Sequence, residues 1–257
     1  MTANLEIRMF PCLSDNYGYL VHDPQSGDTA CIDTPEARPI LAELERTGWT
    51  LGWIFNTHHH PDHTGGNLEI KRATGCTIIG NGADAARIPG IDVTVRDGDT
   101  FDFAGHAVEV LETPGHTVGH IVYYIPDQSL AFVGDTLFAM GCGRLFEGSP
   151  AQMWDSLSKL RRLPEETRIY CAHEYTLANG RFALSVDPDN EDLKRRMNEV
   201  EAARRDKRPT IPTTVALERR TNPFLRADAA DFAAGLGLAG RPPAEVFAET
   251  RRRKDNF

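Results

Sequence analysis

The sequence predicts an α/β protein with a layered N-terminal domain and a smaller helical C-terminal domain. Short runs of β-branched and aromatic residues alternate with stretches of helical spacing through the first two thirds of the chain. Strands alternating with helices are typical of layered α/β domains. The last third has mainly helical spacing, interrupted by prolines. We therefore expect one domain over residues 1–174 and a second over residues 175–257.

Composition narrows the class of protein and its setting. The chain has 257 residues, of which 40% are hydrophobic and 25% charged, as in globular proteins. No apolar run is long enough to span a membrane, and the N-terminus lacks a basic stretch followed by an apolar one. The five cysteines are scattered and odd in number, which favours reduced thiols. We therefore expect a cytoplasmic protein with no membrane partner.

The charge distribution argues against a nucleic-acid partner. The net charge is −9, and the acidic excess lies within residues 1–175. Phosphates would be repelled by that part of the chain. Residues 176–257 carry a small basic excess, which fits either solvated helix faces or attraction of a small anion.

The N-terminal elements begin with a predicted hairpin. Strand-like runs over 17–21 and 29–33 flank a turn that contains Pro24 and Gly27. Further strands, rich in Val, Ile, Tyr and Phe, are expected at 53–55, 76–80, in pieces between 93 and 101, and at 107–112, 121–125, 130–133 and 168–172. Helical spacing predicts helices at 39–46, 66–73, 151–163 and 192–207, and a last helix from Pro242.

A histidine-rich loop follows the strand at 53–55. It presents His58, His60, Asp62 and His63 within six residues. Alternate residues of an extended segment point the same way, so His58, His60 and Asp62 can converge. Imidazole and carboxylate groups are preferred ligands of zinc and similar divalent ions. A polar surface loop is the alternative, and an artificial tag would lie at a terminus without the aspartate. His59 should point away from its neighbours.

Three further strand ends finish in a potential ligand. His116 follows the strand at 107–112, Asp135 follows 130–133, and His173 follows 168–172. Any one of them could be a structural histidine or a turn aspartate. Their recurrence favours a shared site, because ligands in layered α/β folds gather at strand ends.

In this order the seven residues resemble the metallo-β-lactamase superfamily over roughly residues 5–174. The resemblance implies a four-layered αβ/βα sandwich with a two-metal site. His58, His60 and His116 would hold one ion, Asp62, His63 and His173 the second, and Asp135 would bridge them. Zinc is the expected metal, with iron or manganese as alternatives. Asp62 and Asp135 would act with a metal-bridging hydroxide of lowered pKa.

Segments outside the ligand set resemble one branch, the glyoxalase II or hydroxyacylglutathione hydrolase family. They are Asp15-Asn16-Tyr17, Gly141-Cys142-Gly143-Arg144, Glu174-Tyr175, Thr221-Asn222-Pro223-Phe224 and the basic C-terminal run 251–254. The resemblance implies glutathione contacts from Arg144, Tyr175, Arg251 and Lys254. Two positions depart from eukaryotic members, which commonly have lysine at Arg144 and tyrosine at Phe146.

The function implied is hydrolysis of the thioester of S-(2-hydroxyacyl)glutathione, typically S-D-lactoylglutathione, to glutathione and D-lactate. This is the second step of methylglyoxal detoxification. A glutathione persulfide dioxygenase with a single iron is the alternative enzyme. A tRNA-processing nuclease of the same superfamily is disfavoured by the acidic N-terminal part. A catalytically silent metal-binding module is the alternative without enzyme activity. The expected partner is a small molecule, and we expect a monomer.

Overall fold

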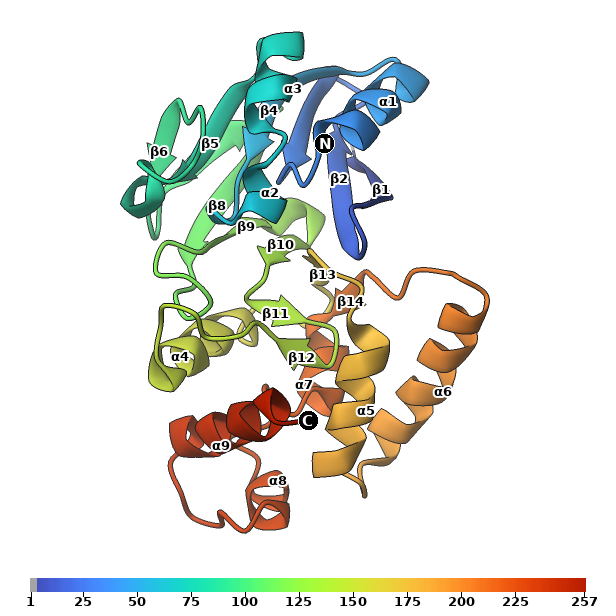
Figure 1. The fold of residues 1–257 in the computed structure, drawn as a ribbon, viewed down its shortest axis with the longest axis vertical. Coiled ribbons are helices and arrows are strands. Elements are labelled where there is room, and N and C mark those ends of the chain that lie inside the picture. The colour runs from blue at the N-terminus through green and yellow to red at the C-terminus, as the bar shows by residue number, and fades with distance from the viewer. Residues whose placement is uncertain (1–3) are drawn as a thin grey trace. The chain divides into compact units, whose positions relative to one another are not determined.

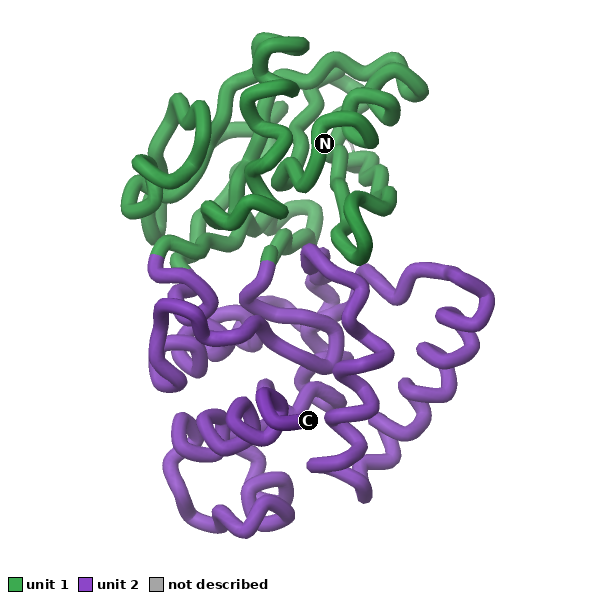
Figure 2. Tube along the Cα trace, viewed as in Figure 1, with its two compact units in different colours: residues 1–112, 119–134 green, residues 113–118, 135–257 purple. Residues whose placement is uncertain are grey.

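The computed structural model describes residues 4–257, and its contacts divide the chain into two compact units (Figure 2). Unit 1 comprises residues 1–112 and 119–134, and unit 2 comprises residues 113–118 and 135–257. Each unit is assembled from two separate segments. The expected domains, 1–174 and 175–257, are instead two consecutive stretches of chain. The two divisions therefore group the residues differently.

The first sheet of unit 1 has six strands in sequence order (Figure 1). They are β1 (Glu6–Cys12), β2 (Asn16–His22), β3 (Asp28–Ile32), β4 (Thr50–Phe55), β5 (Thr77–Asn81) and β6 (Val93–Val95). β1 to β3 pair antiparallel, and β3 to β6 pair parallel. The carboxyl ends of β3 and β4 therefore lie side by side, because parallel neighbours in register end together. This places Asp33 beside the loop that begins at Asn56.

Helices α1 (Ala37–Thr47) and α3 (Asn67–Thr74) pack on this sheet. Ile40 of α1 and Ile70 of α3 are fully buried in one cluster with Ile54 and Ile78 of the strands. Gly48 ends α1 in the left-handed conformation, as expected for a helix that glycine terminates. The four-residue helix α2 (Pro61–Thr64) lies between β4 and α3.

A second, antiparallel set of strands completes unit 1. It contains β7 (Thr100–Phe103), β8 (His106–Glu112), β9 (Ile121–Ile125) and β10 (Leu130–Gly134). Phe55 of β4 contacts Phe103 and Tyr123 of this set, and the Tyr123 hydroxyl donates a hydrogen bond to Asn56 O. These aromatic contacts lie in the core between the two sheets. Unit 1 thus contains helices, a mixed sheet and an antiparallel set of strands.

Unit 2 is mainly helical (Figure 1). Its helices are α4 (Pro150–Leu160), α5 (Thr176–Val186), α6 (Glu191–Arg205), α7 (Val215–Thr221), α8 (Ala230–Gly235) and α9 (Pro243–Asp255). Its strands are β11 (Leu137–Phe138), β12 (Gly141–Cys142), β13 (Arg168–Cys171) and β14 (Thr213–Thr214). α4 begins with a capping box between Ser149 and Gln152. Leu193, Met197 and Ala183 form a core between α5 and α6.

Within the C-terminal part, expected to be helical as a whole, the helices α5, α7 and α8 were not predicted individually. The sequence also missed the strand β1. Most of its residues are only partly buried or exposed, and it contains Pro11. The alternation of exposed and partly buried residues stops after Met9, and proline favours the edge of a sheet, where β1 lies.

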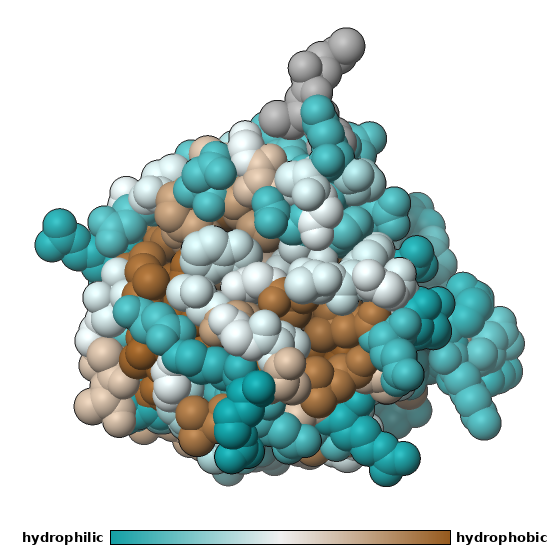
Figure 3. Space-filling view, turned by 90° about the horizontal axis from the view of Figure 1, so that it is seen from above, coloured by the Kyte–Doolittle hydropathy of each residue, from teal (hydrophilic) through white to brown (hydrophobic). Residues whose placement is uncertain are grey.

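The surface of the chain combines polar and apolar side chains. Within residues 4–257, none of the helices combines the length and apolar character needed to cross a membrane. The face in Figure 3 carries many polar side chains with an apolar area among them. Apolar atoms on a protein surface are normal, so this face alone indicates no partner.

Candidate metal centre

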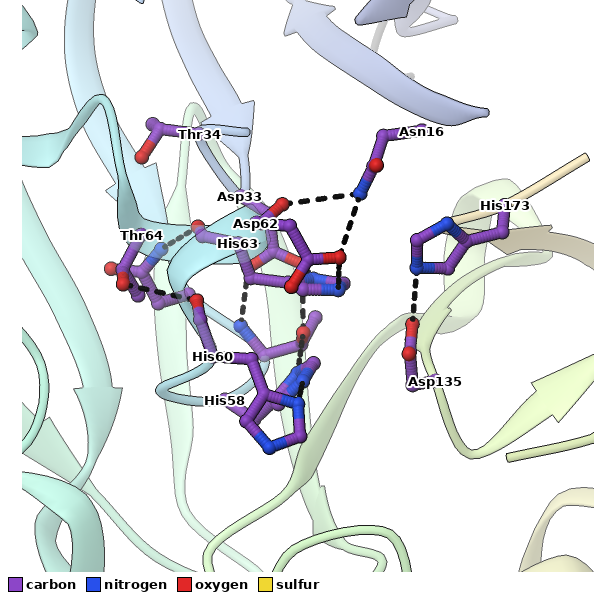
Figure 4. Close-up of polar contacts among 12 residues, drawn as sticks. Asn16, Asp33, Thr34, His58, His60, Asp62, His63, Thr64, Asp135 and His173 are labelled. Atoms are coloured by element: carbon purple, nitrogen blue, oxygen red, sulfur yellow. Dashed lines mark hydrogen bonds and ion pairs between the residues drawn. The ribbon is translucent and has the colours of Figure 1, made fainter. Parts of the chain in front are cut away.

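The histidine-rich loop of unit 1 runs from the end of β4 into α2. Pro61 occupies the first helical position, where its missing N–H costs nothing. Thr64 Oγ1 donates to His60 O at 3.1 Å, and Asn56 Nδ2 donates to His63 O at 3.0 Å. These bonds fix the backbone on both sides of the turn, so the side chains of the loop project from a rigid frame (Figure 4).

Donor atoms converge in two pairs on this loop. His58 Nε2 lies 3.0 Å from His60 Nδ1. His63 Nε2 lies 3.5 Å from Asp62 Oδ2. His58 and His63 are buried, and Asp62 is partly exposed. The alternation expected from the sequence therefore brings His58 and His60 together, while Asp62 pairs with the adjacent His63.

Two side chains from the first sheet orient this loop. Asp33, directly after β3, accepts hydrogen bonds from the Thr57 N–H at 2.7 Å and the Thr57 hydroxyl at 2.7 Å. Its Oδ2 atom also lies 2.8 Å from His63 Nδ1. Asn16 Nδ2 donates to Asp62 Oδ2 at 3.2 Å. With Nδ1 of His63 facing a carboxylate, Nε2 is the ring nitrogen directed toward Asp62.

His59 and His120 have supporting positions. His59 Nδ1 lies 3.0 Å from Asp84 Oδ2, and its ring is in edge contact with the ring of His60, centroids 4.9 Å apart. The ring of His120 stacks on the ring of His58, with the centroids 4.8 Å apart.

In unit 2, Asp135 lies between two histidines. Its Oδ2 atom is 3.4 Å from His116 Nε2. Its Oδ1 atom is 3.4 Å from His173 Nε2, as Figure 4 shows. All three side chains are buried. His116 Nδ1 lies 2.8 Å from Arg144 O, so the ring presents Nε2 to Asp135. Each oxygen of the Asp135 carboxylate thus faces the Nε2 atom of a different histidine.

The chemistry of these side chains fits divalent metal ions. The described residues contain groups of histidine and aspartate with the composition of metal sites. Imidazole nitrogen and carboxylate oxygen are the ligands that zinc prefers, and iron and manganese accept them too. Second partners fix the rings of His63 and His116, a common feature of metal-binding histidines.

The four residues expected to contact glutathione all lie in unit 2, in different environments. Arg144 and Tyr175 are exposed, and the ring of Tyr175 is stacked on that of His173, centroids 4.7 Å apart. Arg251 is buried, and its Nη1 donates to Cys142 O at 3.1 Å. Lys254 lies over the ring of Phe182. Burial, and then the positive charges of Arg251 and Arg144, lower the pKa of Lys254, so these cations share one neighbourhood.

Sequence reasoning assigned no role to Asp33 or Asn16. Asp33 ends a predicted strand, as Asp135 does, and that signal could have identified it. Asn16 gave no comparable signal. It is the first residue of β2, and its hydrogen bond to Asp62 joins residues that are far apart in the sequence.

Known proteins resemble this chain over nearly its whole length. The family model described as metallo-beta-lactamase superfamily matches residues 27–173, and the model described as hydroxyacylglutathione hydrolase C-terminus matches residues 174–257. A hydroxyacylglutathione hydrolase of Maricaulis maris is 57% identical over 255 residues, 99% of this chain and 100% of that protein.

Solved structures give the same fold. ETHE1 from Myxococcus xanthus matches with a TM-score of 0.67 and 26% identity, covering 98% of this chain and 100% of that one. TTHA1623, in a di-iron-bound form, matches with a TM-score of 0.60 and 27% identity, covering 86% of this chain and 100% of that one. These likenesses confirm the α/β sandwich with a helical C-terminal region expected from the sequence.

Proposed function

Because the chain belongs to the hydroxyacylglutathione hydrolases of the metallo-β-lactamase superfamily, we propose that it hydrolyses S-(2-hydroxyacyl)glutathione, with S-D-lactoylglutathione as the typical substrate. Water adds to the thioester carbonyl carbon and the C–S bond breaks. The products are glutathione, which takes the proton on sulfur, and D-lactate. This reaction is the second step of methylglyoxal detoxification. The persulfide dioxygenase alternative is not favoured, since the hydrolase name recurs among relatives matched over the whole chain.

The proposed cofactor is a pair of divalent metal ions, with zinc first and iron or manganese as alternatives. His58, His60 and His116 would hold one ion, and Asp62, His63 and His173 the other, with Asp135 shared. Three arrangements within the units support this: the His58–His60 pair, the Asp62–His63 pair, and Asp135 with one oxygen toward each of two histidines. TTHA1623, described in a di-iron-bound form, shows that a protein of this fold can bind two ions.

Metal ions held there would supply a water of lowered pKa and polarise the thioester carbonyl. The side chains have separate tasks. Asp62 accepts a hydrogen bond from the attacking water and directs it at the carbonyl carbon, while Asn16 holds the Asp62 carboxylate in place. Asp135 presents one carboxylate oxygen to each of two histidines, His116 and His173. Asp33 keeps the His63 ring in one orientation.

Glutathione is held by the cations of unit 2. Lys254 and Arg144 offer positive charge to its carboxylates, and Arg251 adds to the same field. Tyr175, whose ring is stacked on His173, would offer its hydroxyl to glutathione. The two family models meet at 173/174, which supports a catalytic domain over 1–174 and a glutathione-binding domain over 175–257. We also propose a cytoplasmic monomer that binds neither nucleic acid nor membrane.

The observation that carries this proposal is the end-to-end likeness to hydroxyacylglutathione hydrolases, with every potential ligand present. The test is turnover of S-D-lactoylglutathione by the purified protein, with metal content measured in parallel. We expect turnover with two ions bound and loss of turnover after chelation. Asp135→Asn should abolish turnover and the binding of two ions. Asp102→Asn, at an exposed carboxylate, should change neither turnover nor metal content. Oxygen uptake with glutathione persulfide and a single iron would establish the dioxygenase instead.

A further inference from the structure

A short hairpin in unit 2 connects Asp135 to Arg144. Its strands, β11 and β12, have two residues each and pair only through Leu137 with Cys142 and Phe138 with Gly141. Met140 in its turn has φ of 56°, a left-handed conformation that costs free energy for a residue other than glycine. An isolated two-stranded ribbon of this size is not stable in water. Other parts of the chain must therefore hold it.

Side chains from the C-terminal helices bind the hairpin backbone directly. Asn222, which caps the end of α7, donates from Nδ2 to Phe138 O at 3.1 Å and to Gly141 O at 2.9 Å. Glu218 of α7 accepts a hydrogen bond from Met140 N at 2.9 Å. Side chains of α7 and its cap thus hydrogen-bond to individual carbonyl and amide groups of the hairpin backbone, which fixes the conformation of the turn.

Two more helices complete this frame. Asn179 of α5 donates to Ala139 O at 3.2 Å, and Arg251 of α9 donates to Cys142 O at 3.1 Å. A side chain at Gly141 would collide with Asn179, because a Cβ there would lie 2.4 Å from its Nδ2 atom. The helices therefore approach the hairpin as closely as its backbone permits.

Glu218 is itself buried and fully engaged. It forms an ion pair with buried Arg196, accepts from Thr213 Oγ1 at 2.6 Å, and accepts from Asn222 Nδ2 at 2.9 Å. Removing two charges from water costs about as much as their attraction returns, so a buried ion pair is weak evidence for stability. What the network does is hold the Glu218 carboxylate in one position, where it accepts the hydrogen bond from Met140 N.

The far end of the hairpin reaches the candidate metal ligands. Arg144 O accepts the hydrogen bond that orients the His116 ring, at 2.8 Å from Nδ1. Gly143 packs on Asp135, since a Cβ there would lie 2.1 Å from Asp135 O and 3.0 Å from His116 Nδ1. A shift of the hairpin would therefore move both His116 and Asp135.

We propose that Asn222 and Glu218 are positioning residues for the hydrolytic reaction. They act through the hairpin to hold the His116 ring and the Asp135 carboxylate in the geometry that binds metal. Neither side chain contacts these ligands itself. This inference rests on the proposed metal site, and it gives the C-terminal helices a role in building that site in addition to binding glutathione.

The test compares Asn222→Ala with Asn190→Ala. Asn190 is an asparagine of the same unit that caps α6 and donates to Arg220 O, without contact to the hairpin. Three quantities are measured: the affinity for Zn²⁺ by competition with a chromophoric chelator, kcat/KM, and hydrogen exchange of amides 137–142 in metal-free protein. Loss of partners outside a ligand shell typically lowers metal affinity or activity about 10–100-fold, and we expect this for Asn222→Ala. Asn190→Ala should leave the hairpin exchange and the metal affinity near wild type.

The outcomes separate this inference from the proposed function. A folded Asn222→Ala protein with wild-type Zn²⁺ affinity and unchanged exchange would overturn the inference while the hydrolase activity stands. Equal losses in both variants would also overturn it, since they would indicate general destabilisation. If Asn222→Ala does not fold, Asn179→Ala, which removes a single bond to the hairpin, is judged by the same criteria. An inactive, metal-loaded wild-type protein would instead refute the proposed function.

Discussion

His63 and Asp33 form a buried pair, with His63 Nδ1 2.8 Å from Asp33 Oδ2. The same carboxylate accepts both the backbone N–H and the hydroxyl of Thr57. Asp33 therefore joins the start of the histidine-rich loop to its end. Because it follows β3, the parallel neighbour of β4, the sheet itself places it there.

Asp33→Asn tests this link. The amide keeps the shape but removes one acceptor and presents a donor, so His63 or Thr57 loses its partner. Outer partners of metal ligands typically contribute about 10–100-fold to metal affinity or activity, and we expect a loss of that size. Titration with Zn²⁺ and steady-state kinetics measure it. Asp23→Asn, at a carboxylate that caps the turn after β2, is the control and should retain both properties. Unchanged Zn²⁺ binding by Asp33→Asn would contradict the orienting role.

Arg251 and Lys254 should differ when each is replaced by methionine. Lys254→Met keeps the apolar stem over Phe182 and removes the charge, so KM should rise far more than kcat falls. Arg251→Met also leaves Cys142 O without its donor, and an unsatisfied buried group costs about 1–3 kcal/mol. Its free energy of unfolding should therefore fall as well. Urea unfolding and kinetics of both proteins check this, with Arg252→Met as an exposed control on the same helix. Equal loss of kcat and kcat/KM in Lys254→Met would refute anchoring.

KM should depend on pH through Lys254. Burial, with the charges of Arg251 and Arg144, holds the pKa of this ammonium below its ordinary value. The group is charged below its pKa and neutral above it. As the pH rises through the lowered pKa, attraction for the glutathione carboxylates is lost and KM increases, earlier than for an ordinary lysine. A KM profile of wild type against Lys254→Met measures this dependence. Identical profiles would show that another group is responsible.

The cysteines should be unreactive in the folded protein. All five are free and buried. Burial raises the pKa of Cys12 and Cys171 to about 12 and that of Cys142 to about 11. The thiolate is the reactive form, so native protein should react slowly with an aromatic disulfide reagent and rapidly after unfolding. Fast stoichiometric labelling of native protein would contradict the burial of these side chains.

The sequence predicted most elements because their signals are local. The run at 53–55, the helix stop at Gly48 and the proline that opens α9 each depend on neighbours within a few residues. The candidate ligands were visible for the same reason, since each lies in a short segment that follows a strand. β1 carried no such signal, because an edge strand with mixed burial is stabilised by its partner β2.

The sequence by itself determined the family of the chain and its candidate metal ligands, because spacing and residue type are enough to define both. Tertiary structure decided which groups hold those side chains. The Arg144 carbonyl on His116, Asp33 on His63, and Asn222 on the hairpin join residues far apart in the chain. Such hydrogen bonds depend on where the backbone passes after folding, and backbone atoms are the same at every position of the sequence.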